Sequence, residues 1–384
     1  MGGGMKTVAL ELDPCFGERS GVGLYAYELI RRMRDGNALQ FVGQTFNFAG
    51  RRNIREALPE LSIPIRENRF LHYGLLQRLW NRLPIPYQRF FSDKADLHVF
   101  FNYIVPPHIA GPVLTTVHDM SYLRFPETLR RENLKRLRDG MSYSFARSVR
   151  IITSSEFSRR EIVELAGIPE SKVSVIPGAP GASREMAPFE TVAARYGIRG
   201  PYLLYVGTIE PRKNLVRLLH AFDRLKASDG IPHQLVLAGG KGWRTGEFDK
   251  ELTALPCRQD VVLTGYVPDR VRNSLYRNAA AFVYPSLYEG FGLPPLEAMR
   301  LGCPVVCCDT ASLPEVTGDA AELIDPLSED SLQAGIRRVL CDKRYAASLA
   351  KRGRVQASRY SWDDSAQRLR ELCAEILNLD RVIA

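Results

Sequence analysis

Short apolar runs alternate with helix-like segments along almost the whole of this 384-residue chain. Apolar runs of about four to eight residues are typical of buried strands, and their regular alternation with amphipathic segments predicts βαβ units with parallel strands. In the first half we expect strands at residues 7–12, 39–43, 96–101, 112–117 and 149–155. In the second half we expect them at 201–207, 233–240, 260–267, 279–286, 304–309 and 320–325.

A break in composition divides this pattern. Residues 175–190 are rich in Pro, Gly and Ala, as expected of a segment between domains, and the chain is too long for one ordinary core. We therefore predict an α/β protein with two Rossmann-like, doubly wound parallel-sheet domains that face a central cleft. We place the domains at residues 1–180 and 200–360, with a linker at 181–199 and a last helix, about 361–384, that packs back on the first domain.

Positive charge is concentrated in the first half. Residues 1–180 contain 25 Lys and Arg against 18 Asp and Glu, so +7 of the formal net charge of +9 lies there. Such an excess attracts nucleic acid, an anionic membrane surface or phosphorylated ligands, and composition does not choose among them. Residues 66–91 and 124–150 mix aromatic, leucine and arginine side chains. They are consistent with a membrane-facing surface or with solvated helices that bury an apolar stripe.

The sequence shows no membrane-spanning or secretory signal. No apolar run approaches the roughly 18 residues that cross a bilayer. We expect a cytoplasmic protein, either free or peripheral on the inner face of the plasma membrane. The seven cysteines lack paired C-x-x-C elements, which favours reduced, buried thiols over a zinc site.

A glycine-rich segment follows the first predicted strand. Residues 17–29 contain G-x-G-x-x-A at Gly21, Gly23 and Ala26, a spacing typical of loops that hold a pyrophosphate. A dinucleotide-binding domain would also have an acidic residue at the end of the next strand, but GQTFN stands there. A tight turn is the simplest alternative. We favour a loop that lets a ligand approach the backbone at the start of a helix.

Further polar residues follow predicted strands, whose carboxyl ends face ligands in open α/β sheets. His118 and Asp119 are the first case, and His118 offers a hydrogen-bond partner with adjustable charge, although a structurally satisfied histidine is the commoner outcome. Arg212 and Lys213 come after the strand at 201–207 and before an amphipathic helix. Two cations and a helix N-terminus favour a phosphate there, and a solvent-exposed pair is the alternative.

The segment YEGFGLPPLE, residues 288–297, places two glutamates eight positions apart. Glu289 follows the predicted strand at 279–286, and we expect Glu297 in the first turn of the helix that the Pro-Pro pair begins. The glycines between them leave N–H groups open to a polyhydroxyl ligand, and a carboxylate can accept two hydrogen bonds from a ribose. Stabilisation of the helix dipole would explain Glu297 without a ligand, but it gives no reason for Glu289.

Together these motifs resemble the retaining family-4 glycosyltransferases of GT-B fold, and among them the bacterial mannosyltransferases of surface-polysaccharide assembly. The resemblance covers nearly the whole chain. It rests on GVG at 21–23, His118, GTIEPRKNL at 207–215, the E-x(7)-E element at 289–297, and VVCCDTASLPEVTGDAA at 305–321. An E-x(7)-E element behind an Arg-Lys pair is specific, whereas a glycine loop alone is not.

The resemblance assigns roles to these residues. Arg212 and Lys213 would bind the diphosphate of a nucleotide sugar and stabilise it as it leaves. Glu289 would contact the donor sugar, His118 would touch that sugar from the other domain, and Glu297 would hold the nucleotide ribose. The remaining donor contacts would come from Gly207, Val267, Gly290, Phe291 and Gly292, and the loop of Gly21, Val22 and Gly23 would border the diphosphate and the acceptor.

The implied reaction is retaining transfer of a hexose to a glycan or lipid-linked acceptor, with mannose from GDP-mannose as the specific prediction. Fixed positive charge on the leaving diphosphate would do the work of a metal ion, so we expect no metal or cofactor, and no nucleic acid as partner. A glycosidase-like mechanism needs two carboxylates about 5 Å apart across the anomeric carbon. If Glu297 holds the ribose, it cannot be one of them.

Three other interpretations stay open. A non-hydrolysing nucleotide-sugar epimerase has the same architecture and would alter a sugar without an acceptor. A catalytically silent scaffold would bind nucleotide or a partner protein, but the intact set of Arg212, Lys213, Glu289, Glu297 and His118 argues against it. A dehydrogenase rests on the glycine loop alone.

Overall fold

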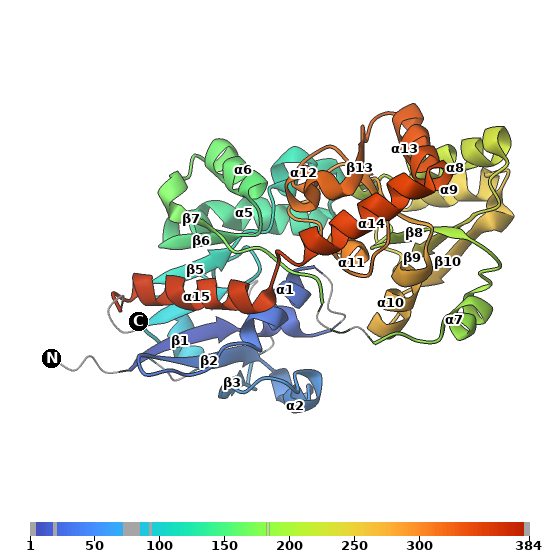
Figure 1. Cartoon of the computed structure of the whole chain (residues 1–384). Coiled ribbons are helices and arrows are strands. Elements are labelled where there is room, and N and C mark those ends of the chain that lie inside the picture. Colours follow the sequence, from blue (N-terminus) through green and yellow to red (C-terminus); the bar gives the residue numbers. More distant parts are fainter. Residues whose placement is uncertain are drawn as a thin grey trace.

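The computed structural model describes residues 5–17, 21–71, 85–91, 94–181, 183 and 185–379. It contains two parallel sheets, one in each half of the chain, each packed among helices (Figure 1). The first sheet has the order β3-β2-β1-β4-β5-β6-β7. Its strands are β1 (Lys6–Glu11), β2 (Leu39–Phe46), β3 (Ile65–Asn68), β4 (Leu97–Phe100), β5 (Val113–Thr116), β6 (Arg150–Thr153) and β7 (Val173–Val175).

The second sheet has the order β10-β9-β8-β11-β12-β13. Its strands are β8 (Tyr202–Val206), β9 (Gln234–Ala238), β10 (Val261–Gly265), β11 (Ala281–Tyr284), β12 (Val305–Cys308) and β13 (Ala321–Ile324). Every strand predicted from the sequence is present, and β3 and β7 are additional short edge strands. The predicted α/β fold with two doubly wound parallel sheets is confirmed.

Each sheet reverses its strand order beside its own first strand. β1 pairs with β2 on one side and β4 on the other, and β8 pairs with β9 and β11 in the same way. Loops that leave the carboxyl ends of the two neighbouring strands diverge at such a switch point, and the crevice between them is where open α/β sheets bind ligands. This strand order predicts ligand crevices between β1 and β4 and between β8 and β11.

The connecting helices begin and end at ordinary signals. Ser155 caps α6 (Glu156–Ala166) by accepting the Ser158 N–H, and Gly167 ends the helix in the left-handed conformation. The other helices of the first half are α1 (Val22–Ile30), α2 (Ile54–Ala57), α4 (Ser121–Arg124) and α5 (Arg131–Arg147). Those of the second half are α7 (Phe189–Tyr196), α8 (Leu215–Asp229), α9 (Gly246–Ala254), α10 (Asp269–Asn278), α11 (Leu293–Arg300), α12 (Leu313–Thr317), α13 (Glu329–Cys341), α14 (Lys343–Ala357) and α15 (Trp362–Ile376).

The last helix returns to the first sheet, as Figure 1 shows for α15. Trp362, Leu369 and Cys373 are buried in the core of the first half together with residues of β1 and α1. The Trp362 ring packs edge-on against Tyr25 of α1, with ring centroids 5.8 Å apart. Ser361 begins the helix by accepting the N–H groups of the two aspartates that follow Trp362.

The segment between the sheets is partly helical. α7 lies inside the predicted linker at 181–199, and its buried Val192 joins the core of the second half. Gly197 ends α7 in the left-handed conformation just before β8. The linker therefore packs against the second half rather than running free.

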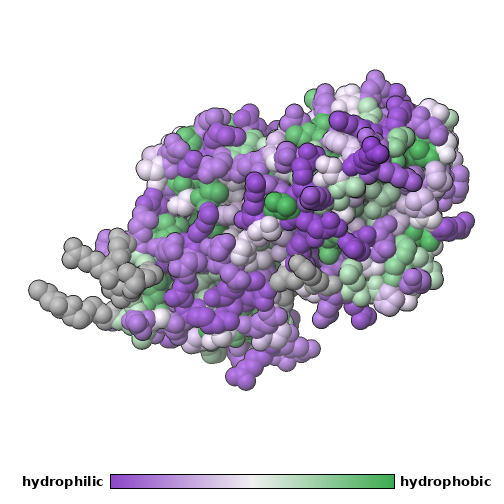
Figure 2. Space-filling model, in the orientation of Figure 1, coloured by the Kyte–Doolittle hydropathy of each residue, from purple (hydrophilic) through white to green (hydrophobic). Residues whose placement is uncertain are grey.

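The two basic-aromatic segments have different outcomes. Residues 72–84, half of the first segment, lie outside the described residues. In the second segment, α5 buries Leu137, Met141 and Phe145 and exposes most of its charged side chains, which matches the amphipathic-helix interpretation. Figure 2 shows hydrophilic residues over most of one face, with hydrophobic residues scattered among them. Among the described residues, no helix is long and apolar enough to cross a bilayer.

Candidate active site

Two cations and a carboxylate meet at the switch point of the second sheet. Arg212 and Lys213 end a short 3-10 turn after β8, and Glu289 lies in the loop after β11. Lys213 Nζ lies 2.5 Å from Glu289 Oε1, and Arg212 Nη1 lies 3.1 Å from Glu289 Oε2. Each cation thus contacts a different oxygen of one carboxylate. Since all three side chains are at most 16% exposed, solvent screens the cluster weakly.

Burial and charge work against each other in this cluster. Burial opposes the charged form of Glu289, but Arg212 and Lys213 outweigh it and lower the pKa of the carboxyl to about 2. Burial and the neighbouring guanidinium lower the pKa of Lys213, whereas Glu289 and Glu210 raise the pKa of Arg212 despite its burial. Glu289 is therefore ionised at neutral pH. No structural reason for this glutamate was evident from the sequence, and the neutralisation of two buried cations supplies one.

Two neighbours complete the cluster. Arg212 Nη2 donates to Glu210 Oε1 at 2.8 Å. Tyr284, at the end of β11, donates its hydroxyl to Glu289 Oε1 at 2.9 Å and lies 3.1 Å from Lys213 Nζ. Both are buried, and sequence patterns did not single them out. Position could have indicated Tyr284, because it ends the strand that leads into Glu289.

The loop that carries Glu289 contacts the first half of the molecule directly. The Gly290 carbonyl accepts hydrogen bonds from Ser155 Oγ at 2.6 Å and Ser158 Oγ at 3.0 Å, both at the start of α6. A Cβ atom on Gly290 would lie 2.1 Å from the His118 carbonyl oxygen. Glycine is required here because the loop of one half touches the backbone of the other.

Tyr288 strengthens the same contact between the halves. Its hydroxyl accepts the Met120 N–H at 2.9 Å and donates to the buried carboxylate of Glu161 in α6. Glu161 also pairs with Arg124 Nε at 2.6 Å. The backbone carbonyl of Tyr288 accepts from Arg212 Nη1 at 2.5 Å. One residue therefore joins the cation cluster to the loop that follows His118, and the sequence analysis missed it.

His118 lies after β5 at the carboxyl edge of the first sheet, as predicted. Its Nε2 is 2.8 Å from the Phe101 carbonyl, and its ring packs edge-on against Tyr25 and Tyr103 at centroid distances of 5.3 and 5.5 Å. Burial lowers the pKa of His118. The imidazole is thus neutral at pH 7, and because Phe101 offers only an acceptor, Nε2 carries the proton.

The glycine loop has two different parts. Gly21 precedes α1 with φ +50°, is exposed, and has open space where a Cβ would stand. Val22, the first helical residue, is half-buried. A Cβ on Gly23 would lie 2.6 Å from the Pro14 carbonyl oxygen, so this glycine permits close packing of the helix on the preceding turn. Gly21 is therefore available to a ligand, and Gly23 serves the packing of α1.

Glu297 is not in the first helical turn. α11 begins at Leu293, which makes Glu297 its fifth residue, and the helix has no acidic residue in its first turn. The carboxylate is buried against α10, where Tyr276 donates to it at 3.1 Å and Arg272 Nη2 lies 3.4 Å away. Burial raises the pKa of Glu297, although Arg272 acts in the opposite direction. Dipole stabilisation therefore does not explain this residue. Arg272 and Tyr276, four positions apart on one helix, were not identified from the sequence.

The remaining predicted donor residues lie around the same edge of the second sheet. Gly207 follows β8 with φ +154°, and a Cβ on Gly239, which follows β9, would lie 2.0 Å from the Gly207 carbonyl oxygen. Gly292 precedes α11 with φ +108°. Val267 is buried after β10, and the Phe291 ring is buried against Tyr360 at a centroid distance of 5.6 Å. The side chains of the last two are therefore engaged in packing.

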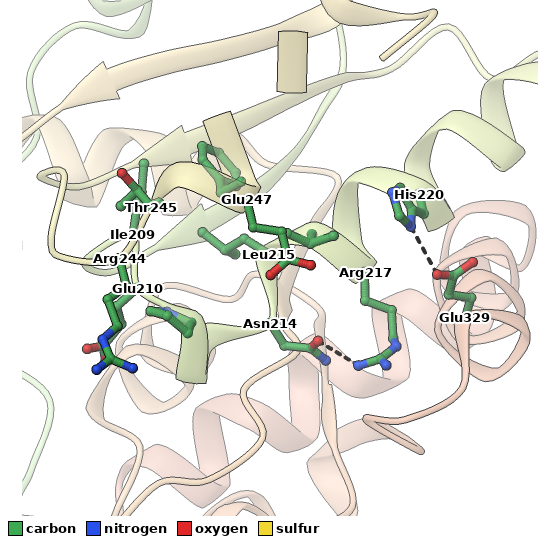
Figure 3. Close-up of a pocket in the computed structure, with 13 residues that line it drawn as sticks. Ile209, Glu210, Asn214, Leu215, Arg217, His220, Arg244, Thr245, Glu247 and Glu329 are labelled. Carbon is green, nitrogen blue, oxygen red and sulfur yellow. Dashed lines mark hydrogen bonds and ion pairs between the residues drawn. The ribbon is translucent and has the colours of Figure 1, made fainter. Parts of the chain in front are cut away.

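A cavity of about 320 Å³ lies beside Glu210, between the first turn of α8 and α9 (Figure 3). Glu210 and Asn214 line it, and so do Arg217 and His220. His220 lies between Glu329 at 3.0 Å and Glu251 at 3.3 Å, and the two carboxylates raise its pKa although burial lowers it. Of the cluster residues Glu210 lines the cavity, whereas Arg212, Lys213, Tyr284 and Glu289 do not.

Two Rossmann-like domains, each with its own parallel sheet, are the architecture of the GT-B fold. The family model described as "Glycosyltransferase Family 4" matches residues 19–179, and the one described as "Glycosyl transferases group 1" matches residues 193–356. The chain is 31% identical to O-antigen chain mannosyltransferase B of Escherichia coli over 90% of its own length and 93% of that protein. It therefore belongs to the family-4 glycosyltransferases, as the sequence motifs predicted.

Other similarities agree with this assignment. The chain is 26% identical to O-antigen chain mannosyltransferase RfbU of Salmonella typhimurium, over 68% of this chain and 69% of that protein. Sucrose-phosphate synthase of Thermosynechococcus elongatus has a similar fold, with a TM-score of 0.72 over 97% of this chain and 99% of that one at 19% identity. WaaG, a lipopolysaccharide glycosyltransferase, has a TM-score of 0.70 over 95% and 99% at 17% identity. These structures establish the fold alone.

Proposed function

We propose that this chain is a retaining mannosyltransferase that moves mannose from GDP-mannose to a glycan or lipid-linked acceptor of a bacterial surface polysaccharide. The observation that carries the proposal is the buried pair of Arg212 and Lys213, held with Glu289 at the switch point of the second sheet and next to His118 of the first. Mannose as the transferred sugar is supported by two similar proteins that are named O-antigen chain mannosyltransferases.

Arg212 and Lys213 would stabilise the departing diphosphate. Transfer breaks the bond between the anomeric carbon and the β-phosphate oxygen, so negative charge develops on that oxygen as the sugar becomes oxocarbenium-like. Fixed cations in a water-poor site stabilise such charge without reorganising. The acceptor oxygen then bonds to the anomeric carbon, and its proton passes to the departing phosphate. This chemistry draws its positive charge from the chain, so the proposal includes independence from a metal ion.

Glu289 keeps the two cations paired before the donor arrives. A diphosphate brings its own negative charge to Arg212 and Lys213, which weakens their hold on the carboxylate and frees it to accept hydroxyls of the donor sugar. Glu297, already bonded through Tyr276 and close to Arg272, would accept the ribose hydroxyls. The two glutamates would thus hold opposite ends of one nucleotide sugar.

Thermal unfolding with nucleotide diphosphates tests donor binding. A ligand at about 100 times its Kd stabilises the folded chain by about 2.7 kcal/mol, and GDP should raise Tm more than UDP or ADP. Arg212→Ala should abolish the GDP shift. Arg337→Ala is the matched control, because Arg337 also pairs with a carboxylate, Asp229 at 2.7 Å, but on the surface between α13 and α8. A GDP shift that persists in R212A contradicts the proposed site.

Product analysis tests the reaction. Incubation with GDP-mannose and a mannoside acceptor should give GDP and a glycoside with an α-linkage, since the donor is α-linked and configuration is retained. An inverted product contradicts retention. Conversion of the donor sugar without an acceptor would instead identify an epimerase.

The proposal also places the protein on the inner face of the plasma membrane, where a lipid-linked acceptor would meet the basic first half. Flotation with vesicles that contain anionic lipid should carry the chain upward, and salt should release it. Equal flotation with neutral vesicles contradicts the electrostatic part of this proposal.

A further inference from the structure

The switch point of the first sheet also carries an ionisable side chain, one that no sequence motif indicated. Glu11 is the last residue of β1 and is partly exposed. β4, the strand beside it, ends at Phe100, and the N–H of Phe101 donates to Glu11 Oε2 at 3.0 Å. The carbonyl of the same Phe101 accepts from His118 at 2.8 Å. One residue after β4 therefore fixes both Glu11 and His118 at the crevice between β1 and β4.

The two sheets place their polar groups in equivalent positions. In the second sheet, the cluster joins residues after the first strand, β8, to a residue after the strand on its other side, β11. In the first sheet, Glu11 at the end of β1 is joined to Phe101 after β4 in a similar way. The second crevice presents cations, which suit a diphosphate, and the first presents a carboxyl group. A carboxyl group can hydrogen-bond hydroxyls but offers no positive charge to a phosphate, so the two crevices suit different ligands.

The charge of Glu11 supports this distinction. Burial and the nearby Asp13 raise the pKa of Glu11 to about 8, although the Phe101 N–H and Arg136 lower it. The carboxyl is therefore mostly protonated at pH 7. A protonated carboxyl both donates and accepts hydrogen bonds, as a sugar hydroxyl does, and it adds no charge that would repel the donor diphosphate.

Glu11 has more capacity for a ligand than its neighbour. Asp13 is engaged on the β2 side, where Thr45 Oγ1 donates to it at 3.0 Å and Arg52 Nη1 lies 3.3 Å away. Within the described ranges, the Phe101 N–H is the one hydrogen-bond partner of the Glu11 carboxyl group. One carboxyl oxygen is therefore fixed by a hydrogen bond, and the carboxyl keeps hydrogen-bonding capacity that no described residue uses.

We propose that Glu11 is an acceptor-binding residue, whose carboxyl group hydrogen-bonds a hydroxyl of an uncharged sugar at the reacting end of the acceptor. This inference rests on the proposed function, because it assigns the first crevice to the acceptor of the same transfer. His118, held by the same Phe101, would then border the bond that forms between the donor sugar and that acceptor.

Acceptor kinetics test the proposal with three variants. Glu11→Ala removes the carboxyl, and Glu11→Gln keeps a neutral group that can still accept the Phe101 N–H and both donate to and accept from a hydroxyl. Asp96→Ala is the matched control, because Asp96 accepts the Thr7 N–H at 2.9 Å at the opposite edge of the same sheet. D96A therefore measures how the kinetic constants change when a carboxylate that is hydrogen-bonded within this sheet, but distant from the proposed acceptor site, is removed.

At saturating GDP-mannose, E11A should raise the KM for octyl α-mannoside by about tenfold or more, and E11Q by about threefold or less. The KM for the donor should change by less than about twofold in both variants. An acceptor KM in E11A that equals that of D96A overturns the inference. So does an equal rise of the donor and acceptor KM values.

Binding without a donor separates this inference from the proposed function. Saturation-transfer NMR of octyl α-mannoside on the full chain should show a signal for the wild type and D96A, and lose it in E11A. That result supports the glycan site even when the chain accepts no GDP-mannose. A wild type without a signal, an undiminished signal in E11A, or a stronger response to mannose 6-phosphate overturns the inference.

Discussion

Replacing Tyr288 with phenylalanine should loosen the contact between the two domains without damaging either of them. The substitution keeps the ring, which packs against Phe125 and Phe157 of the first domain at centroid distances of 5.4 and 5.8 Å. It removes only the hydroxyl, which accepts the Met120 N–H at 2.9 Å and donates to the buried Glu161. Both partners belong to the first domain, so the substitution weakens the observed contact between the domains, which we call the closed arrangement.

The size of the effect follows from the two bonds. A buried N–H left without a partner costs about 1–3 kcal/mol, and a carboxylate that loses one donor adds a similar amount. Glu161 keeps its bond from Arg124 at 2.6 Å, which limits the cost of the donor that its carboxylate loses. We expect Y288F to destabilise the closed arrangement by about 2–4 kcal/mol, which lowers the ratio of closed to open molecules by about 30-fold or more.

Energy transfer between two dyes measures this ratio. Cys341 is the one exposed cysteine, since the other six are buried, and it lies in the second domain. A second dye site comes from K135C on α5 of the first domain, where the lysine side chain is 78% exposed. Y345F is the matched control, because the Tyr345 hydroxyl also donates to a glutamate, Glu322, but within the second domain. Y288F should lower the transfer efficiency and Y345F should not.

The kinetic signature should separate positioning from donor binding. Y288F leaves the contacts of Arg212 and Lys213 with Glu289 intact, so the Kd for GDP should stay within about twofold while kcat falls about tenfold or more. Equal transfer efficiency and equal kcat in the wild type, Y288F and Y345F would show that the hydroxyl does not hold the domains together.

Three further outcomes follow from the same structure. Gly290→Ala would place a Cβ 2.1 Å from the His118 carbonyl oxygen, so it should open the dye-labelled protein while leaving the Kd for GDP near its wild-type value. Glu289, with its pKa lowered to about 2, contributes about 3 kcal/mol to the free energy of unfolding, in full above pH 4.5 and progressively less as the pH falls toward 2. Glu289→Gln should therefore reduce the loss of stability between pH 4.5 and pH 2, measured by urea unfolding at stepped pH. Trp362→Ala removes a buried ring that packs on Tyr25 and should cost the first domain about 3–5 kcal/mol in the same unfolding assay.

The fold was predictable because its central strands are continuous apolar runs between helical segments. β3 (Ile65–Asn68) and β7 (Val173–Val175) escaped prediction because they are short and lie at the two edges of the first sheet, where half-buried polar residues interrupt the apolar pattern. Edge strands bury less surface than central ones, so their sequences carry a weaker signal.

Site residues could be predicted from the sequence where each one directly follows a predicted strand. Arg212, Lys213 and Glu289 each follow a predicted strand, and strand order brings the three together. Tyr288 and Glu161 could not be paired from the sequence, because they lie 127 positions apart and meet only when the domains dock. The prediction that Glu297 lies in the first turn of its helix was wrong, because α11 begins at Leu293, before the Pro-Pro pair.

The loop that carries Glu289 also packs against the two segments where the chain crosses between the domains. The chain crosses between the domains twice, near Gly178 and near Tyr360, and α15 beyond the second crossing is fixed to the first sheet. The Phe291 ring packs against Tyr360, and it would lie 3.2 Å from a Cβ on Gly178. Phe291 is two residues from Glu289, and Gly290 between them contacts His118. A rotation of the domains that displaces either crossing therefore displaces the loop that holds Glu289, so binding of a diphosphate at the cations and closure on His118 should favour one another.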